Sequence, residues 1–221
     1  MATAIEYRSR STAGVEPDFS KLMPEEREVC GGITDSGRRA EWIAGRTVVK
    51  EWLCEKLGSG ARTAEIAIIS RDGFGRAVAP RAFWKGSLLP WSISITHAAN
   101  TVLVALAPGA EERIGADLVP LEGVMPRRLE VWMTPREARW VNLATAGQRR
   151  WRTAALWAAK EAAYKALNEG EVFAPEEISV ACSDGDDWTA ESRGRSCRLH
   201  RLDLDALVGV IAVAKSNRGA E

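Results

Sequence analysis

The spacing of apolar residues along the chain predicts a mixed succession of helices and strands. Apolar side chains recur at helical spacing over residues 38–57, and Gly58 follows as a stop signal. Residues 151–169 contain no glycine or proline and many alanines, which predicts a second long helix that ends before Gly170. Shorter apolar or alternating runs predict strands. These runs are 64–70, 91–97, 101–107, 114–119, 178–181, 188–191, 197–202 and 206–214.

Two shorter helices begin with proline. Pro24 precedes acidic residues that suit a first helical turn, and two glycines soon interrupt that segment. The run Thr134-Pro-Arg-Glu137 combines an N-cap residue, a proline at the first helical position and an acid at the third, so we expect a helix to about residue 144. Residues 126–134 are also expected to be helical.

The second long helix carries a charged stripe. Because each helical residue turns by about 100°, Trp157, Glu161 and Lys165 lie within roughly 80° of one another along two turns. The rest of the helix surface carries mostly small alanine side chains, so the helix can pack close against a sheet. The ordinary interpretation of Glu161 and Lys165 is a solvated ion pair worth about 0.2–0.5 kcal/mol, and taken alone this interpretation is favoured.

Two polar residues in or beside apolar strands are further candidates. Asp117 lies within the apolar run 114–119, where a carboxylate has a desolvation cost unless it is paired or binds a metal. His97 ends the run 91–97, and a lone histidine at a strand end is more often an ordinary surface or core residue than a catalytic one.

Composition narrows the function classes. Thirty basic residues balance thirty acidic ones, which argues against a general nucleic-acid binder. With only two histidines, a multi-histidine zinc site is excluded, so any metal should be a hard cation held by oxygen. The four cysteines lack C-x-x-C spacing, and no apolar run reaches the ~20 residues of a membrane span. We therefore expect a cytoplasmic protein with reduced thiols.

Three segments, in this order along the chain, resemble the motifs of one enzyme family. They are Ser94-Ile-Thr-His97, Gly115-Ala-Asp117 and Trp157-Ala-Ala-Lys-Glu-Ala-Ala-Tyr-Lys165. The combination is similar to that of 4′-phosphopantetheinyl transferases of the larger, Sfp-like type. The resemblance spans about residues 24–180.

The resemblance implies an α+β fold of two similar halves. Each half would be a small antiparallel sheet packed with helices, with a ligand cleft for coenzyme A between them, in a monomer. We place the boundary after Ala107, giving an N-terminal half over 1–107 with the coenzyme A contacts and a C-terminal half over 108–221 with the metal site. No repeat is visible in the residues themselves.

The implied reaction is magnesium-dependent transfer of 4′-phosphopantetheine from coenzyme A to a serine hydroxyl of an acyl or peptidyl carrier protein, as in secondary metabolite biosynthesis. Adenosine 3′,5′-bisphosphate would leave. Asp117 and Glu161 would hold Mg²⁺, because magnesium prefers oxygen ligands and keeps several waters. Lys160 and Lys165 would bind phosphate oxygens, and Glu161 is the candidate general base. Asp117, Glu161 and Lys165 would form the catalytic set.

The same resemblance implies a phosphate site in the first half. The helix segment Arg38-Arg-Ala-Glu-Trp-Ile-Ala-Gly-Arg46 is similar to the family's arginine helix, and a guanidinium suits phosphate because it donates two parallel hydrogen bonds. From spacing alone, Arg38 and Arg46 would be a solvated basic face. Arg76 matches a phosphate-binding turn, with Arg71 as the substitute if the loop is shifted.

Thr96 and His97 complete the implied coenzyme A contacts. A protonated His97 would donate a charge-assisted hydrogen bond to an anion, so binding should weaken as the pH rises.

One departure and two alternatives accompany this hypothesis. Val119 stands where many relatives carry a second acid, so two side-chain metal ligands are expected rather than three. The protein could be a catalytically silent relative that binds coenzyme A or a carrier protein, or an adaptor in which the charged stripe is only solvated surface.

Overall fold

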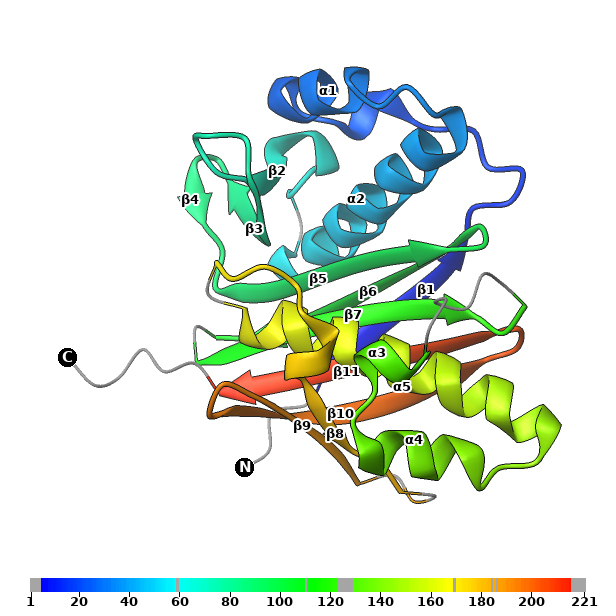
Figure 1. Cartoon of the computed structure of the whole chain (residues 1–221). Helices are drawn as coiled ribbons and strands as arrows, with labels where there is room; N and C mark the ends of the chain where they lie inside the picture. The colour runs from blue at the N-terminus through cyan, green and yellow to red at the C-terminus, as the bar shows by residue number, and fades with distance from the viewer. Residues whose placement is uncertain are drawn as a thin grey trace. The chain divides into compact units, whose positions relative to one another are not determined.

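The computed structural model describes residues 5–58, 60–109, 111–122, 129–168, 170–183, 185 and 187–215. The chain divides into two compact units, residues 1–110 and 111–221. Each unit combines helices with small antiparallel sheets (Figure 1), so the expected α+β fold class is confirmed. None of the described helices is both long and apolar enough to span a membrane.

The first unit contains two three-stranded sheets and one long helix. Its strands are ordered β1-β6-β5 and β2-β3-β4, and every neighbouring pair is antiparallel. In chain order the elements are β1 (Glu6–Ser11), η1 (Phe19–Lys21), α1 (Pro24–Gly31), α2 (Ser36–Leu57), η2 (Thr63–Glu65), β2 (Ile66–Arg71), β3 (Ala77–Trp84), β4 (Ser87–Leu88), β5 (Trp91–Ala98) and β6 (Thr101–Pro108).

The second unit is one five-stranded antiparallel sheet covered by a long helix, in the order β7-β11-β10-β9-β8. Its elements are β7 (Glu112–Pro120), α3 (Leu129–Trp132), α4 (Pro135–Asn142), α5 (Ala146–Leu167), η3 (Pro175–Glu177), β8 (Ser179–Ala181), β9 (Trp188–Ser192), β10 (Arg195–Leu204) and β11 (Leu207–Lys215). Of the helix expected over 126–134, the structure shows residues 129–132, and residues 126–128 lie outside the described part.

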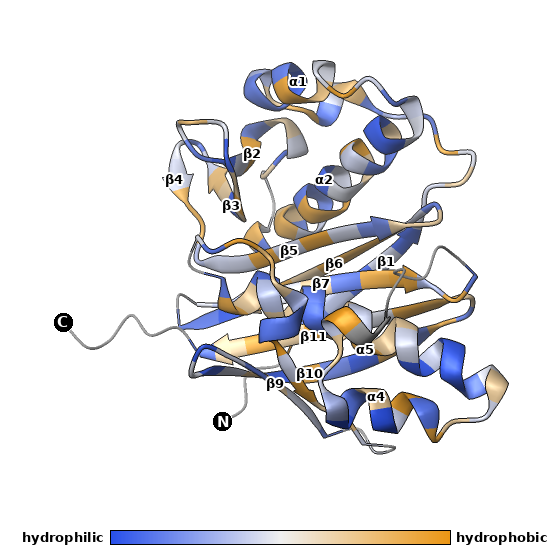
Figure 2. Ribbon diagram, viewed as in Figure 1, coloured by the Kyte–Doolittle hydropathy of each residue, from blue (hydrophilic) through white to orange (hydrophobic). Residues whose placement is uncertain are grey.

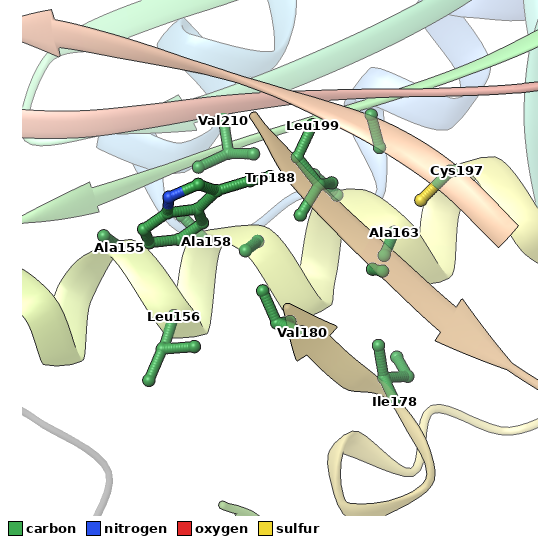
Figure 3. Close-up of a cluster of buried hydrophobic side chains, with 14 of the residues drawn as sticks. Ala155, Leu156, Ala158, Ala163, Ile178, Val180, Trp188, Cys197, Leu199 and Val210 are labelled. Atoms are coloured by element: carbon green, nitrogen blue, oxygen red, sulfur yellow. The ribbon is translucent and has the colours of Figure 1, made fainter. Parts of the chain in front are cut away.

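The alanines of α5 make the close packing expected from the sequence. Ala155, Ala158 and Ala163 are fully buried and face side chains such as Trp188 and Val210 from the sheet (Figure 3). Because alanine projects only a methyl group, the helix backbone lies near the strands. The polar side of the helices is visible on α4, where hydrophilic and hydrophobic positions alternate around the axis (Figure 2).

A buried ion pair ties the short helix of the first unit to its long helix. Lys50, the fifteenth residue of the 22-residue α2, pairs with Glu26, the third residue of α1, and both side chains are almost wholly buried. The other oxygen of Glu26 accepts a hydrogen bond from the Ile68 N–H of β2, at 2.9 Å. Glu26 also accepts from the Met23 N–H at the start of α1, at 2.8 Å.

The second unit repeats this arrangement. Lys160, the fifteenth residue of the 22-residue α5, pairs at 2.9 Å with Glu137, the third residue of α4, and both side chains are fully buried. Glu137 accepts hydrogen bonds from the Val180 N–H of β8 at 2.7 Å and from the Thr134 N–H at 2.7 Å. The two units therefore share a short helix that begins with proline, a long helix and a strand, joined by one buried Lys–Glu pair.

Candidate active site

Gly115 brings helix α5 into direct contact with strand β7. A Cβ atom built on Gly115 would lie 2.0 Å from the Ala162 carbonyl oxygen and 2.8 Å from the Ala166 nitrogen, so only glycine fits. Side chains two residues apart on a strand share a face, so Asp117 projects toward the same helix. The glycine of the Gly-x-Asp segment therefore sets the distance at which the helix meets the carboxylate.

Asp117, Glu161 and Lys165 come together at this contact. The Lys165 ammonium lies 2.8 Å from Asp117 Oδ1 and 3.8 Å from Glu161 Oε2, and it donates to the Ala116 carbonyl oxygen at 2.9 Å. Asp117 is only 6% exposed, whereas about a third of each of the other two side chains is accessible. The structure thus brings together the three residues for which the family resemblance implies catalytic roles.

The closeness of the two carboxylates affects the pKa of Glu161. Burial, together with the negative charge of Asp117, raises the pKa of Glu161 above its ordinary 4.5, although Lys165 and a hydrogen bond from the Trp157 side chain oppose this rise. Lys165 lies close to both acids, and a divalent cation bound beside them would add further positive charge.

The equivalent positions of the first unit show the contrast. Glu51 takes the place on α2 that Glu161 takes on α5, and it pairs with Arg10 and Lys21, each at 2.7 Å. Burial opposes ionisation there, but the two hydrogen bonds outweigh it and lower the pKa of Glu51. The surroundings of the helix acid therefore lower the pKa of Glu51 in the first unit and raise the pKa of Glu161 in the second.

The residues around Asp117 and Glu161 fit a hard cation. Two carboxylates with a backbone carbonyl nearby form the kind of partial oxygen set that magnesium completes with water and substrate oxygens. Among the described residues there is no group of three or more histidine, cysteine or acidic side chains that could hold a metal.

Aromatic rings pack against Trp157, whose side chain donates a hydrogen bond to Glu161. The Trp157 ring makes edge-on contacts with Trp132 at a centroid distance of 5.1 Å and with Phe173 at 5.8 Å. Tyr164, on the same helix, also contacts Phe173. The indole is therefore held while it donates to Glu161, a role that the sequence motif alone does not reveal.

Lys160 lies elsewhere. Besides its ion pair with Glu137, its ammonium donates to the carbonyl oxygens of Pro175 at 2.9 Å and Ile178 at 2.5 Å. These three partners use all three N–H donors of a lysine. Burial also lowers the pKa of Lys160 despite the Glu137 carboxylate. This environment favours a structural role for Lys160 over the expected contact with phosphate.

In the first unit, Arg46 is a buried cation without a carboxylate partner among the described residues. It is 5% exposed, donates to the Ser70 hydroxyl at 2.7 Å and stacks on the Trp42 ring at 3.3 Å, and its Nε atom has no hydrogen-bond acceptor in the described part of the chain. Burial lowers the pKa of Arg46 to about 10, and the nearby Arg71 adds to this, although the charges of Glu26 and Cys30 oppose it. An anion bound here would satisfy the orphaned donor and both charges.

The structure distinguishes the two arginines of the following turn. Arg76 is largely exposed, and its Nε donates to Asp72 at 2.7 Å. Arg71 lies near Arg46 and holds the turn by donating to the Gly75 carbonyl oxygen at 2.6 Å. Arg71 is thus better placed than Arg76 to share an anion with Arg46.

The other residues expected to contact coenzyme A lie at the start of α2 and near the end of β5. Arg38 is exposed in the first turn of α2, whose N-cap is Asp35. Thr96 is buried and His97 half-buried. His97 Nδ1 lies 2.9 Å from Glu41 Oε2, a contact for which the sequence offered no signal beyond the motif itself.

Gly115→Ala should disrupt the site by moving the helix. Overpacking against backbone atoms typically costs about 1–3 kcal/mol of stability, and the separation of Lys165 from Asp117 should change with it. Gly147→Ala, near the start of the same helix, is the matched control because nothing lies within 4 Å of a built Cβ atom. Thermal unfolding of the two variants checks this. A Gly115→Ala protein as stable as Gly147→Ala would contradict the close approach.

Comparisons with known proteins address part of the chain. No curated protein matches. Among solved structures, the holo-[acyl-carrier-protein] synthase of Thermotoga maritima is similar, with a TM-score of 0.38 and 20% sequence identity. The match covers 47% of this chain and 63% of the synthase chain, which is less than two thirds of the synthase's length. A family model described as the 4′-phosphopantetheinyl transferase superfamily matches residues 113–209, less than half of the chain. The segment that holds Asp117, Glu161 and Lys165 is thus similar to the 4′-phosphopantetheinyl transferase superfamily.

Proposed function

We propose that this protein is a 4′-phosphopantetheinyl transferase of the larger, Sfp-like type. It would use Mg²⁺ to transfer 4′-phosphopantetheine from coenzyme A to a serine hydroxyl of an acyl or peptidyl carrier protein. The observation that carries the proposal is the joining of Asp117, Glu161 and Lys165 at the contact of β7 with α5, inside the segment that matches the family model.

The residues of the second unit have distinct tasks in this reaction. Asp117 and Glu161 would hold Mg²⁺, which supplies charge neutralisation at the diphosphate when bound. Lys165 would move from its two carboxylate partners to a phosphate oxygen as negative charge develops there. Glu161 would accept the serine proton, directly or through water.

The bond changes balance without a covalent enzyme intermediate. The serine oxygen forms a bond to the pantetheine-side phosphorus, and the bond from that phosphorus to the bridging oxygen breaks. The bridging oxygen leaves with adenosine 3′,5′-bisphosphate. The serine proton goes to Glu161, so no oxidant or further reactant is needed.

The cations of the first unit would bind phosphate groups of coenzyme A. Arg46 and Arg71 are the strongest candidates because Arg46 is buried with a partnerless Nε atom in the described part of the chain, and Arg71 is close enough to act on its charge. Arg38 and His97 would add contacts, with Arg76 and Thr96 as further members of this set. We also propose a cytoplasmic monomer that acts on carriers of secondary metabolism.

The direct test is to incubate a panel of apo-carrier proteins with coenzyme A, Mg²⁺ and the protein. A gain of the mass of phosphopantetheine on a carrier serine supports the proposal. Coenzyme A binding without any mass gain on the panel would instead favour the catalytically silent relative, and neither binding nor transfer would favour the adaptor.

Replacing Arg46 should weaken substrate binding rather than slow the chemistry. Losing hydrogen bonds to a charged group costs about 1.5–3 kcal/mol, so Arg46→Met should raise the KM for coenzyme A by roughly 10- to 100-fold with little change in kcat. Arg71→Met should have a larger effect than Arg76→Met. Steady-state kinetics check this, with the exposed Arg62→Met as control. A fall in kcat at unchanged KM would contradict the binding role.

A further inference from the structure

Glu41 is an acid on α2 that contacts the side chain of His97 at the end of β5. Its Oε2 atom lies 2.9 Å from His97 Nδ1, and its Oε1 atom accepts from the Asn100 N–H at 3.4 Å. Asn100 belongs to the turn between β5 and β6, where Ala99 and Asn100 both have positive φ. One carboxylate therefore joins the helix, the histidine and the turn.

The other acids on the same helix are neutralised by cations. Glu51 pairs with Arg10 and Lys21, and Glu55 pairs with Arg8. Among the described residues, His97 is the one basic side chain within ion-pair distance of Glu41. The arginine one turn earlier, Arg38, does not pair with Glu41, although an i,i+3 spacing would permit it.

This contact decides which ring nitrogen of His97 can meet a ligand. Since Nδ1 lies within ion-pair distance of the carboxylate, Nε2 is the ring nitrogen left to face other groups. When the ring is protonated, Nε2–H is a charge-assisted donor whose direction is set by the Glu41 anchor.

We infer that Glu41 is a positioning residue, which acts through His97 to aim Nε2 at a phosphate group of the nucleotide. The inference rests on the proposed function, because that proposal makes His97 a phosphate contact. Glu41 itself would repel the phosphate, so its effect on binding must pass through the ring.

A double-mutant cycle tests this with a binding readout that needs no carrier protein. Titration calorimetry would measure adenosine 3′,5′-bisphosphate binding to the wild type, Glu41→Ala, His97→Ala and the double variant. We expect each single change to weaken binding by roughly tenfold, and the double variant to bind like His97→Ala alone. Independent, additive losses would overturn the inference, as would unchanged binding in Glu41→Ala beside weakened binding in His97→Ala.

Two further measurements separate positioning from loss of structure. Glu55→Ala removes an ion pair from the same helix and should leave bisphosphate affinity unchanged. Nitrogen-15 NMR of the neutral His97 ring should show the proton on Nδ1 in the wild type and a shift toward Nε2 in Glu41→Ala. An unchanged tautomer in Glu41→Ala would contradict the anchor.

The two proposals fail differently. If the wild type binds no bisphosphate and modifies no carrier, both the proposed function and the role of Glu41 are contradicted. If the wild type modifies a carrier while Glu41→Ala keeps its KM for coenzyme A, only the role of Glu41 falls. A raised KM at unchanged kcat supports it.

Discussion

Glu161→Gln is expected to abolish carrier modification, with kcat at least about a thousandfold lower, because the variant loses both a metal ligand and the candidate base. Glutamine has nearly the same shape as glutamate and can still accept the Trp157 hydrogen bond. The folded structure should therefore persist. Mass spectrometry of the carrier over time measures the residual rate.

The same change should not destabilise the metal-free protein. Glu161 has a raised pKa, so its negative charge opposes folding once the pH exceeds its ordinary value of 4.5. In that window the folded state binds more protons than the unfolded state, and stability falls as the pH rises. Glu161→Gln removes this penalty, so its melting temperature at pH 7 should equal or exceed that of the wild type.

The stabilisation that Mg²⁺ gives the wild type should increase as the pH rises. Protons compete with the metal for Glu161, so added Mg²⁺ should raise the wild-type melting temperature at pH 7 and have little effect near pH 4.5. The shift should vanish in Glu161→Gln at both pH values. Glu177→Gln, an exposed acid of the same unit that pairs with Arg193, is the matched control and should behave like the wild type. Full activity or an unaltered Mg²⁺ response in Glu161→Gln would contradict the site.

Asp117 offers an independent check because its loss affects Lys165 differently. Asp117→Asn removes the negative charge that pairs with the ammonium at 2.8 Å and that helps raise the Glu161 pKa. We expect transfer to fall as in Glu161→Gln and the pKa of Glu161 to move down. Carbon-13 NMR titration of the glutamate carboxyl groups would show the change.

The sequence predicted the elements whose patterns were strong. Alanine content and the absence of glycine and proline indicated α5, although the structure begins it at Ala146 rather than Trp151. The apolar strands β6 and β11 were found because nearly every position is buried. Strands β1 and β3 were not predicted, since at least half of the residues in each are exposed and apolar periodicity carries no signal there.

Long-range geometry was harder to predict. The motif residues Asp117 and Lys165 could be paired only through the family resemblance, because residues distant in sequence meet through tertiary packing. The role of Gly115 was not recognised, although a glycine in an apolar strand is a signal of close backbone approach. The likeness of the units was missed because it lies in a few residues, such as Glu26 and Glu137, set among unrelated side chains.

Lys160→Met tests whether that lysine binds substrate or supports the fold. Removing one partner from a buried ion pair costs about 3–5 kcal/mol of unfolding free energy. We expect a loss of this size in Lys160→Met, because Glu137 and two backbone carbonyls lose their donor. Lys50→Met should cost a similar amount, since Lys50 has the equivalent place in the first unit. Denaturant unfolding measures both.

Two comparisons make this result decisive. Arg62→Met breaks the exposed ion pair with Glu65 and should change the free energy of unfolding by less than about 1 kcal/mol. Lys160→Met should keep its KM for coenzyme A at temperatures where it remains folded, because its ammonium is enclosed by protein acceptors. A stable Lys160→Met protein with weakened coenzyme A binding would instead establish the phosphate contact that the motif implies. In that case the lysine must leave Glu137 when the substrate binds.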